Sequence, residues 1–373
     1  MKLRLLAVVT VALAFAAPAF AAAPSVDARA YLVANASTGE VLVTHSAHAR
    51  VPIASITKLM TVLVTLEHAR MDDVVTVSPR AASTGEESIH LHARERISVH
   101  DLVAGALIQS ANDAADALAD YVGHGHRAAF VALMNAKARA LGLQDTHFVR
   151  PDGLDAPGHV SSARDVLRLA QVAMHDADVR RIVGERTAII AGGRVLHTWN
   201  DLLGRFPGLI GIKTGHTELA GWCEVAAARG RGLTVYAVVL GAPDRAVRND
   251  ELTELLAWGL SRYRVVPVIA ESRVYATARV GYGRKAVPLV APRDFIRSVR
   301  LGRPLVQRVV APATLALPVR KGEHAGKVEI MLGGNVIATA PLVASRSVSR
   351  PGPGGRLSFY AGRTAHHVWS FLP

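Results

Sequence analysis

The chain has 373 residues but only one cysteine, Cys223, and aromatic residues make up only 5% of it. A single cysteine excludes an intramolecular disulfide, so the core has to hold together by packing alone. Cys223 falls in the strand-like run 222–225, where a free cysteine usually behaves as a small buried apolar residue. We therefore expect a structural thiol rather than a reactive one.

After its N-terminal segment the chain has no run of ~18 consecutive apolar residues, the length that a transmembrane helix needs. The N-terminus carries Lys2 and Arg4, an apolar stretch at 5–16 and an A-x-A pattern at 19–21. This order is typical of a secretory signal peptide, which we assign to residues 1–21; an uncleaved anchor is the alternative. We expect export across the inner membrane to the periplasm or cell envelope, either in solution or peripheral on the membrane.

Motifs of several function classes are absent. The chain has no phosphate-binding loop, no dinucleotide-binding fingerprint and no internal repeat. Histidines are plentiful, as at His90, His92, His124 and His126, but they lack an H-E-x-x-H or cysteine-rich context. We interpret them as surface or loop residues and expect neither a metal nor a cofactor.

Acidic residues are scarce in the last third of the chain. Residues 263–373 contain 17 Lys and Arg against 4 Asp and Glu, whereas residues 1–262 contain 26 of each kind. The whole net charge of +13 therefore lies in the last third. In an exported protein this pattern favours contact with an anionic membrane or envelope polymer over contact with nucleic acid. A merely basic, solvated surface is the alternative.

Beside these absences stand three short motifs, which follow one another as Ser55-Ile56-Thr57-Lys58, Ser110-Ala111-Asn112 and Lys213-Thr214-Gly215. Each motif alone is common and is typical of a helix cap, a turn or a strand end. Together and in this order they match the signature set of serine acyltransferases of the penicillin-binding type, which need no histidine.

The first motif pairs a nucleophile with a base. Residues three apart share one face of a helix, so Lys58 reaches Ser55 if a helix begins at Ser55. Apolar residues follow at helical spacing over 59–66. A helix N-terminus would stabilise an oxyanion at the attacked carbonyl and would lower the pKa of Lys58, because its partial positive charge favours anions and disfavours the ammonium.

The other two motifs supply polar groups to the same cleft. We expect Ser110 and Asn112 in a short loop between helices, where the hydroxyl relays a proton and the amide binds a peptide-like substrate. Lys213 and Thr214 are expected on an edge strand, where they clamp a substrate carboxylate, and Gly215 lets backbone approach backbone.

On these residues the chain resembles the low-molecular-mass penicillin-binding proteins, the serine-type D-alanyl-D-alanine carboxypeptidases. The resemblance runs from about residue 28 to about residue 344. Beyond the three motifs, the matching segments lie at 52–61, 109–114, 141–143, 152–155, 161–165 and 211–221. The chain departs from the family at Ala93-Arg94, where relatives often have Pro-Gly, and at Trp199, where some relatives have Arg. Both departures concern fine specificity rather than the reaction.

The resemblance implies a role for each site residue. Ser55 is the acylated nucleophile, Lys58 the base and Ser110 the proton relay. Backbone N–H groups of Ser55 and His216 form the oxyanion hole, and Arg248, at the start of a helix, helps to hold the terminal carboxylate. The remaining substrate contacts are Asn112, Lys213, Thr214 and Gly215.

The periodicity of the chain predicts a mixed α+β fold. Patterns of strands and helices alternate at 30–44 (strands), 56–174 (helices), 187–198 and 222–240 (strands) and 246–260 (helix). By resemblance, this region is a β-lactamase/transpeptidase-like catalytic domain over 24–262. Short strands punctuated by Gly and Pro then predict a small all-β sandwich over 263–350.

The last residues predict a linker and a tail. Pro and Gly dominate 351–355, and apolar residues recur at helical spacing over 356–373, with basic residues off that stripe. Such an amphipathic tail would lie in a membrane interface, as the resemblance also implies. A tail that packs on its own sandwich is the alternative.

Together, the motifs and the resemblance imply a D-Ala-D-Ala carboxypeptidase that acts on peptidoglycan stem peptides and is acylated by β-lactam antibiotics. Three alternatives stay open. A D,D-endopeptidase would cut peptidoglycan cross-links with the same residues. A β-lactamase is disfavoured by the second domain, and an inactive wall- or membrane-binding module is disfavoured by the intact Ser55, Lys58 and Lys213.

Overall fold

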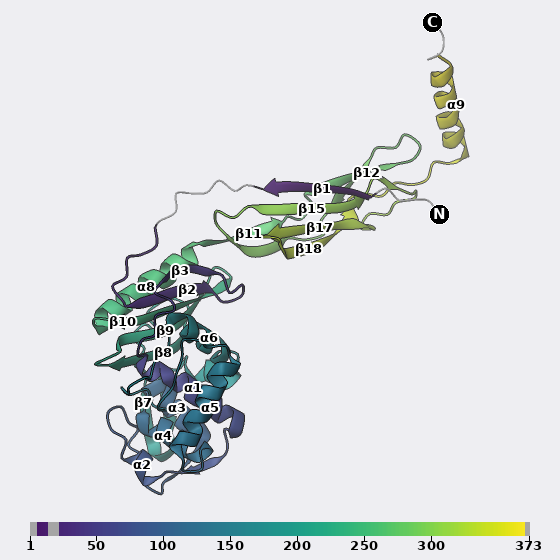
Figure 1. Cartoon of the computed structure of the whole chain (residues 1–373). Helices are drawn as coiled ribbons and strands as arrows, with labels where there is room; N and C mark the ends of the chain where they lie inside the picture. The colour runs from purple at the N-terminus through teal and green to yellow at the C-terminus, as the bar shows by residue number, and fades with distance from the viewer. Residues whose placement is uncertain (1–5, 14–21, 370–373) are drawn as a thin grey trace. The chain divides into compact units, whose positions relative to one another are not determined.

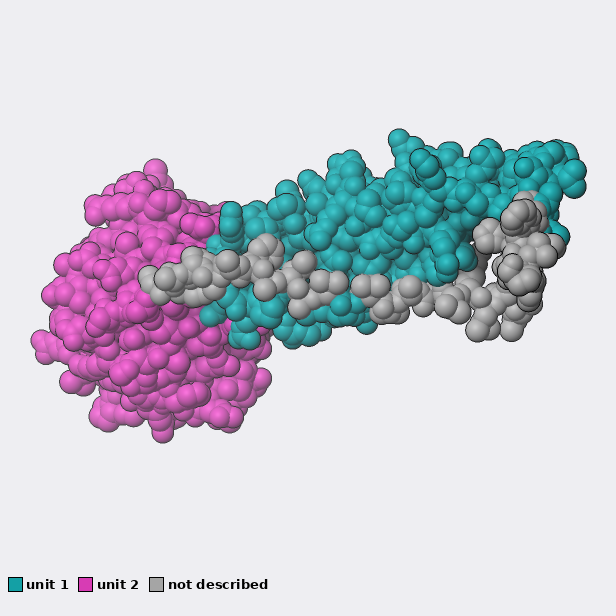
Figure 2. Space-filling model, turned by 90° about the horizontal axis from the view of Figure 1, so that it is seen from above, with its two compact units in different colours: residues 1–20, 263–373 teal, residues 21–262 magenta. Residues whose placement is uncertain are grey.

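A computed structural model describes residues 6–13 and 22–369 of the chain. The chain divides into two compact units between residues 262 and 263, and the N-terminal strand β1 (Leu6–Leu13) belongs with the second unit (Figure 2). Within the described ranges, every helix is too short or too polar to span a bilayer.

The first unit is built on a five-stranded antiparallel sheet in the order β3-β2-β10-β9-β8 (Figure 1). Its strands are β2 (Ala30–Asn35), β3 (Val41–His45), β8 (Leu209–Thr217), β9 (Gly221–Gly230) and β10 (Leu233–Ala242). The predicted strand pairs at 30–44 and 222–240 are confirmed. The predicted edge position of the third motif is also confirmed, since β8 ends the sheet and pairs with β9 on one side.

Helices cover both faces of this sheet. They are α1 (Lys58–His68), α2 (Pro79–Ala82), α3 (Val99–Ala104), α4 (Asn112–Val122), α5 (Arg127–Ala140), α6 (Ala163–Ala173), α7 (Ala177–Ile182) and α8 (Arg245–Ser261). A 3₁₀ turn, η1 (Ala54–Thr57), leads into α1, and a π-helical turn, η2 (Gly105–Gln109), follows α3. The sequence did not predict α2 and α7, because helices of one turn or slightly more carry too little periodicity.

Two small two-stranded sheets complete the first unit. They pair β4 (Val74–Thr76) with β5 (Arg96–Ser98) and β6 (Thr187–Ile190) with β7 (Arg194–His197). The second of them was predicted from its two strand patterns, whereas the first, with strands of three residues, was not.

The central helix α1 explains how the first motif is held. Every residue from Lys58 to Thr65 is buried, because α1 packs against α4, α5 and α6. On the opposite face of the sheet, α8 approaches closely at Gly259, where a Cβ atom would lie 2.9 Å from methyl groups of Val33 and Val235. Because side chains alternate between the two faces of a strand, the sheet packs against helices on both of its faces.

The second unit is an all-β sandwich, as predicted. A seven-stranded sheet in the order β1-β15-β17-β18-β13-β12-β16 packs against the pair β11-β14 (Figure 1). Its further strands are β11 (Tyr263–Ile269), β12 (Val274–Val280), β13 (Val287–Val290), β14 (Phe295–Arg300), β15 (Leu305–Pro312), β16 (Thr314–Leu315), β17 (His324–Leu332) and β18 (Asn335–Ala344). The sequence missed β14, in which Arg297, Ser298 and Arg300 interrupt the apolar residues, so that no strict alternation is visible.

The strand β1 comes from the apolar segment of the predicted signal peptide. It pairs antiparallel with β15, with Leu6 opposite Pro312 and Leu13 opposite Leu305. The predicted cleavage pattern at 19–21 lies outside the described residues. Removal of a signal peptide over 1–21 would leave β15 at the edge of this sheet.

The C-terminal segment corrects one prediction. Helix α9 spans Pro353–Trp369, so the predicted linker 351–355 is wrong from Pro353 onward. Proline is compatible with the first turn of a helix, where its missing N–H has no helical partner. The rings of Phe359 and Tyr360 pack edge-on against Tyr282 of the sandwich, while Leu357 remains 75% exposed.

Candidate active site

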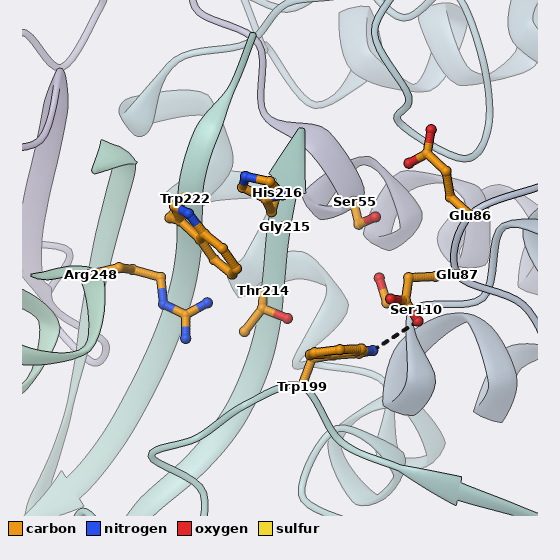
Figure 3. A pocket seen from close by; sticks show the side chains of 10 residues that line it. All are labelled: Ser55, Glu86, Glu87, Ser110, Trp199, Thr214, Gly215, His216, Trp222 and Arg248. Atoms are coloured by element: carbon orange, nitrogen blue, oxygen red, sulfur yellow. Dashed lines mark hydrogen bonds between the residues drawn. The ribbon is translucent and has the colours of Figure 1, made fainter. Parts of the chain in front are cut away.

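The three motifs meet at one cleft of the first unit, with a volume of about 220 Å³ (Figure 3). Ser55 comes from η1, Ser110 from the junction between η2 and α4, and Thr214 from the edge strand β8. The residues that line the cleft are Ser55, Glu86, Glu87, Ser110, Trp199, Thr214, Gly215, His216, Trp222 and Arg248. Segments far apart in sequence thus converge as the motifs predict.

The side-chain amine of Lys58 makes three short contacts, one of them with Ser55. Its Nζ atom is 2.7 Å from Ser55 Oγ, from Asn112 Oδ1 and from the backbone oxygen of Asp152. The oxygens of Asn112 and Asp152 only accept hydrogen bonds, whereas a hydroxyl both donates and accepts. A neutral Lys58 can therefore donate to these two oxygens and accept the hydroxyl proton of Ser55.

The surroundings of Lys58 favour this neutral form. Its side chain is completely buried, and burial lowers the pKa of Lys58 to about 8, although the carboxylates of Asp152 and Asp116 partly oppose the shift. Burial penalises the ammonium because it removes the water that solvates the charge. The amine is therefore available as a base near neutral pH.

Ser110 occupies a strained position. Its backbone is left-handed, with φ 66° and ψ 24°, directly after the π-helical turn η2. The predicted loop between helices is therefore shorter than expected: Asn112 is already the first residue of α4. Strained residues of this kind cluster at functional sites, where the surrounding structure stabilises them.

Asn112 joins Lys58 to the rim of the cleft. While its Oδ1 accepts from Lys58, its Nδ2 donates to the backbone oxygen of Gly85 at 3.1 Å. Its backbone N–H donates to the oxygen of Glu87 at 2.7 Å. The amide of Asn112 thus fixes both the base and the loop that carries Glu87.

Lys213 reaches the second motif from β8. Its Nζ donates to Ser110 Oγ and to the backbone oxygen of Thr214, both at 2.9 Å. Burial, and then the charge of Lys58, hold the pKa of Lys213 well below its ordinary value. Lys58 therefore contacts Ser55 and Lys213 contacts Ser110, and the charge of Lys58 disfavours the charge of Lys213.

Gly215 permits the contact between β8 and the first motif. A Cβ atom at this position would lie 2.9 Å from the backbone nitrogen of Ser55 and 3.0 Å from the oxygen of Ile53. Any larger residue would separate the strand from the nucleophile. The close approach of backbones predicted for Gly215 is therefore confirmed.

His216 follows at the mouth of the cleft. Its exposed ring stacks on Trp222, with 4.1 Å between ring centroids. The neighbouring strand β9 supplies Trp222, which pairs with His216 in the register of the sheet. The stack fixes the outer end of β8 beside Ser55.

Arg248 lines the far end of the cleft. It lies in the first turn of α8, which begins at Arg245, so its predicted place at the start of a helix is confirmed. Asp244 caps this helix through Val247 N and so extends it. The guanidinium is only 1% exposed and donates to Asp201 Oδ2 at 3.3 Å and to Asn249 Oδ1 at 2.5 Å.

Sequence reasoning missed several residues of the cleft. Glu86 and Glu87 form its acidic rim, and Trp199, noted only as a departure, donates from Nε1 to Glu87 Oε2 at 3.1 Å (Figure 3). Arg245 stacks over Trp199 and makes a bidentate ion pair with Asp201. These contacts join positions far apart in the chain, and no local pattern signals them.

Two further predictions concern the single thiol and the histidine and acidic side chains that a metal ion would need. Cys223 is completely buried, and burial raises the pKa of its thiol to about 11, so the structural interpretation is confirmed. Among the described residues, no three His, Cys, Asp or Glu side chains are grouped as a metal ion would require.

The chain was compared with known proteins. The family profile for D-alanyl-D-alanine carboxypeptidase matches residues 17–244, and the profile for the C-terminal domain of penicillin-binding protein 5 matches residues 263–350. D-alanyl-D-alanine carboxypeptidase DacC of Escherichia coli is 33% identical over 96% of this chain and 91% of its own length. DacA of the same organism is 30% identical over 92% of this chain and 89% of its own length.

Solved structures agree with these relatives. Penicillin binding protein 5 from Haemophilus influenzae superimposes with a TM-score of 0.65 at 28% identity, over 88% of this chain and all of the other. The DD-transpeptidase of Streptomyces K15 superimposes with a TM-score of 0.61 at 30% identity, over 65% of this chain and all of the other. The predicted fold, a transpeptidase-like domain followed by a β-sandwich, is therefore confirmed. The chain belongs to the D-alanyl-D-alanine carboxypeptidase family of serine-type hydrolases.

Proposed function

We propose that this protein is a D-alanyl-D-alanine carboxypeptidase that removes the terminal D-alanine from peptidoglycan stem pentapeptides through an acyl-enzyme on Ser55. The observation that carries the proposal is the 2.7 Å contact between Lys58 Nζ and Ser55 Oγ in a buried site. Asn112 Oδ1 and the backbone oxygen of Asp152 accept the N–H groups of Lys58, so the amine can accept the hydroxyl proton of Ser55. This arrangement activates a hydroxyl that would otherwise be a poor nucleophile.

In the acylation step, Ser55 Oγ attacks the carbonyl carbon of the penultimate D-alanine while its proton passes to Lys58 Nζ. The backbone N–H groups of Ser55 and His216 stabilise the oxyanion that forms. Gly215 supports this assignment, because its lack of a side chain keeps β8 against Ser55.

Collapse of the tetrahedral intermediate breaks the peptide bond and needs a proton on the leaving amine. Ser110 relays this proton, and its contact with Lys213 at 2.9 Å supports the role. Terminal D-alanine then leaves, and water hydrolyses the ester on Ser55. The proton that Lys58 takes from Ser55 is thus returned through Ser110 to the leaving amine, so the step balances.

The substrate carboxylate binds at the β8 end of the cleft. Lys213, Thr214 and Arg248 supply a positive charge, a hydroxyl and a guanidinium there, and Asn112 and Gly215 contact the peptide backbone. Burial of Lys213 and Arg248 supports this role, since a cation held out of water gains most from an arriving anion. A β-lactam carries a strained amide and a carboxylate in a similar arrangement, so we expect penicillins to acylate Ser55.

We place the enzyme in the periplasm, at the surface of the inner membrane. The N-terminal pattern at 1–21 supports export. The exposed Leu357 on α9 and the basic second unit support contact with anionic headgroups. The second unit would then position the cleft relative to the cell wall.

Product analysis tests the proposal. The purified protein is incubated with pentapeptide muropeptides and, separately, with cross-linked dimers, and the products are identified by mass spectrometry. Release of one alanine from the pentapeptide, absent with Ser55→Ala, supports the proposal. Cleavage of dimers without release of alanine would assign an endopeptidase, and no product together with no penicillin labelling would contradict acyl transfer altogether.

A further inference from the structure

A buried acid lies directly behind the proposed carboxylate site. Glu224 on β9 is the cross-strand partner of Thr214 on β8. Its side chain is 0% exposed, and its Oε2 atom is 3.2 Å from Arg248 Nε. Burying an isolated carboxylate costs several kcal/mol of folding free energy, so the position of Glu224 needs an explanation.

Glu224 influences Arg248 through charge rather than through orientation. Within the described part of the chain, Arg248 makes no hydrogen bond of ordinary geometry to either carboxyl oxygen of Glu224, and the side chain of Asn200 lies within hydrogen-bonding reach of that carboxyl. The Nε and Nη2 atoms of Arg248 are instead directed by Asn249 and Asp201. Loss of the Glu224 charge would therefore leave the guanidinium in place.

The positive and negative groups around Glu224 shift its pKa in opposite directions. Arg248 and Arg245 face it from α8, Lys213 from β8, and Asp201 from the segment before β8. Burial raises the pKa of Glu224 to about 7; Arg248 opposes this shift and Asp201 reinforces it. Both protonation states are therefore accessible near neutral pH, and an additional charge nearby would decide between them.

We propose that Glu224 takes up a proton from solvent when a terminal carboxylate binds at Thr214 and Arg248, and that it thereby makes carboxylate affinity depend on pH. The inference rests on the proposed function, which places the substrate carboxylate at these two residues. The arriving anion repels ionised Glu224 and competes for Arg248, so the acid form becomes favoured. By linkage, protonation of Glu224 strengthens carboxylate binding to the same extent.

The direction of the effect follows from the charges. Below the pKa of Glu224 the acid is neutral, and the charge of Arg248 attracts the substrate without a competitor. Above it, the ionised acid repels the substrate. The KM for a carboxylate substrate should therefore rise with pH through neutrality, independently of any change in kcat caused by Lys58.

The first test measures proton uptake directly. The inactive Ser55→Ala protein is titrated by calorimetry at pH 7.5, in two buffers of different ionisation enthalpy, with an acetylated tripeptide ending in D-Ala-D-Ala or with its C-terminal amide. We expect uptake of about half a proton with the carboxylate peptide and none with the amide. Binding of the carboxylate peptide without proton uptake, or equal binding of the two peptides, would overturn the inference.

The second test uses Glu224→Gln, which imitates the neutral acid. Its KM for the carboxylate peptide at pH 8 should fall about fivefold and become independent of pH, a change of about 1 kcal/mol. A purely structural role would raise KM instead. A wild-type KM profile in a folded Glu224→Gln protein would overturn the inference. Undiminished proton uptake after this substitution is added to the Ser55→Ala protein would overturn it too, because it would assign the proton to Lys58 or Lys213.

Glu251→Gln is the matched control. Glu251 is another buried acid of the first unit, 7% exposed on α8, but it accepts from the backbone N–H of Asp27 and does not line the cleft. We expect it to keep the wild-type proton uptake and KM profile, and loss of proton uptake in this variant would contradict the assignment to Glu224. Failure of the proposed function is distinguishable, because it would abolish penicillin labelling and alanine release in the unmodified protein.

Discussion

The two units of this protein differ in whether charged side chains are buried. In the first unit, Lys58, Lys213, Arg248 and Glu224 are almost completely buried around the cleft. In the described part of the second unit, the buried polar side chains are those of Gln307 and Glu329, and none of the Lys and Arg side chains with described exposure is buried. Residues 263–373, which make up most of this unit, nevertheless account for the whole net charge of +13.

This difference distinguishes the unit suited to carry out the reaction from the unit suited to position the enzyme. Burying a charge costs several kcal/mol, and shifted pKa values gather where a reaction needs them. Charges at a surface keep their hydration and act at long range on an oppositely charged partner. The buried charges therefore mark the first unit as the reacting unit, and the exposed charges suit the second unit for holding the enzyme at an anionic surface.

The largest expected effect is that of Ser55→Ala. The variant should lose covalent labelling by penicillin completely and lose D-Ala-D-Ala hydrolysis by at least about a thousandfold. Its thermal unfolding should be unchanged, since only one partly exposed hydroxyl is removed. Labelling is read by mass spectrometry of the intact protein, and stoichiometric labelling of the variant would contradict the nucleophile assignment.

Lys58→Ala comes next. Loss of the base should slow acylation by about a hundredfold to ten-thousandfold, measured as the rate of penicillin labelling. In the wild-type protein this rate should rise with pH until about pH 8, because the base is the neutral amine and burial sets its pKa near that value. The variant should lose this dependence. A retained rise in the same pH range would assign it to another group.

Lys213→Ala should fail in a different way. Its loss should reduce kcat/KM about tenfold to a hundredfold for a peptide ending in a carboxylate, because a charge-assisted contact is removed. A matched peptide with a C-terminal amide should suffer less. If the variant discriminates between the two peptides as the wild type does, the clamp role is wrong and Lys213 serves Ser110 alone.

The smallest effect on turnover is expected from a change in the second unit. Deletion of 356–373 should leave hydrolysis of a soluble peptide unchanged but reduce co-sedimentation with anionic liposomes at moderate salt. The apolar residues of α9 and the basic sandwich would otherwise act together. Equal sedimentation of both forms would exclude the tail as an anchor and leave the basic surface of the sandwich as the candidate.

The sequence alone determined the features that depend on neighbours along the chain. Lys58 lies three residues from Ser55, so a helical turn suffices to bring the amine to the hydroxyl. The alternation in β9 and β10 and the periodicity of α5 and α6 are local in the same sense. The mixed fold class followed from these local patterns, and the three motifs in their order carried the resemblance to the family.

Only the tertiary structure decided which distant groups share the cleft. Trp199 meets Glu87 across 112 positions, and Arg248 meets Glu224 and Asp201 from three separate segments. The register of β8 against β9 sets Glu224 behind Thr214, and a shift by one residue would have turned it to the other face of the sheet. Burial and the charges that face a group, which together set its pKa, arise from this long-range packing and leave no local trace in the chain.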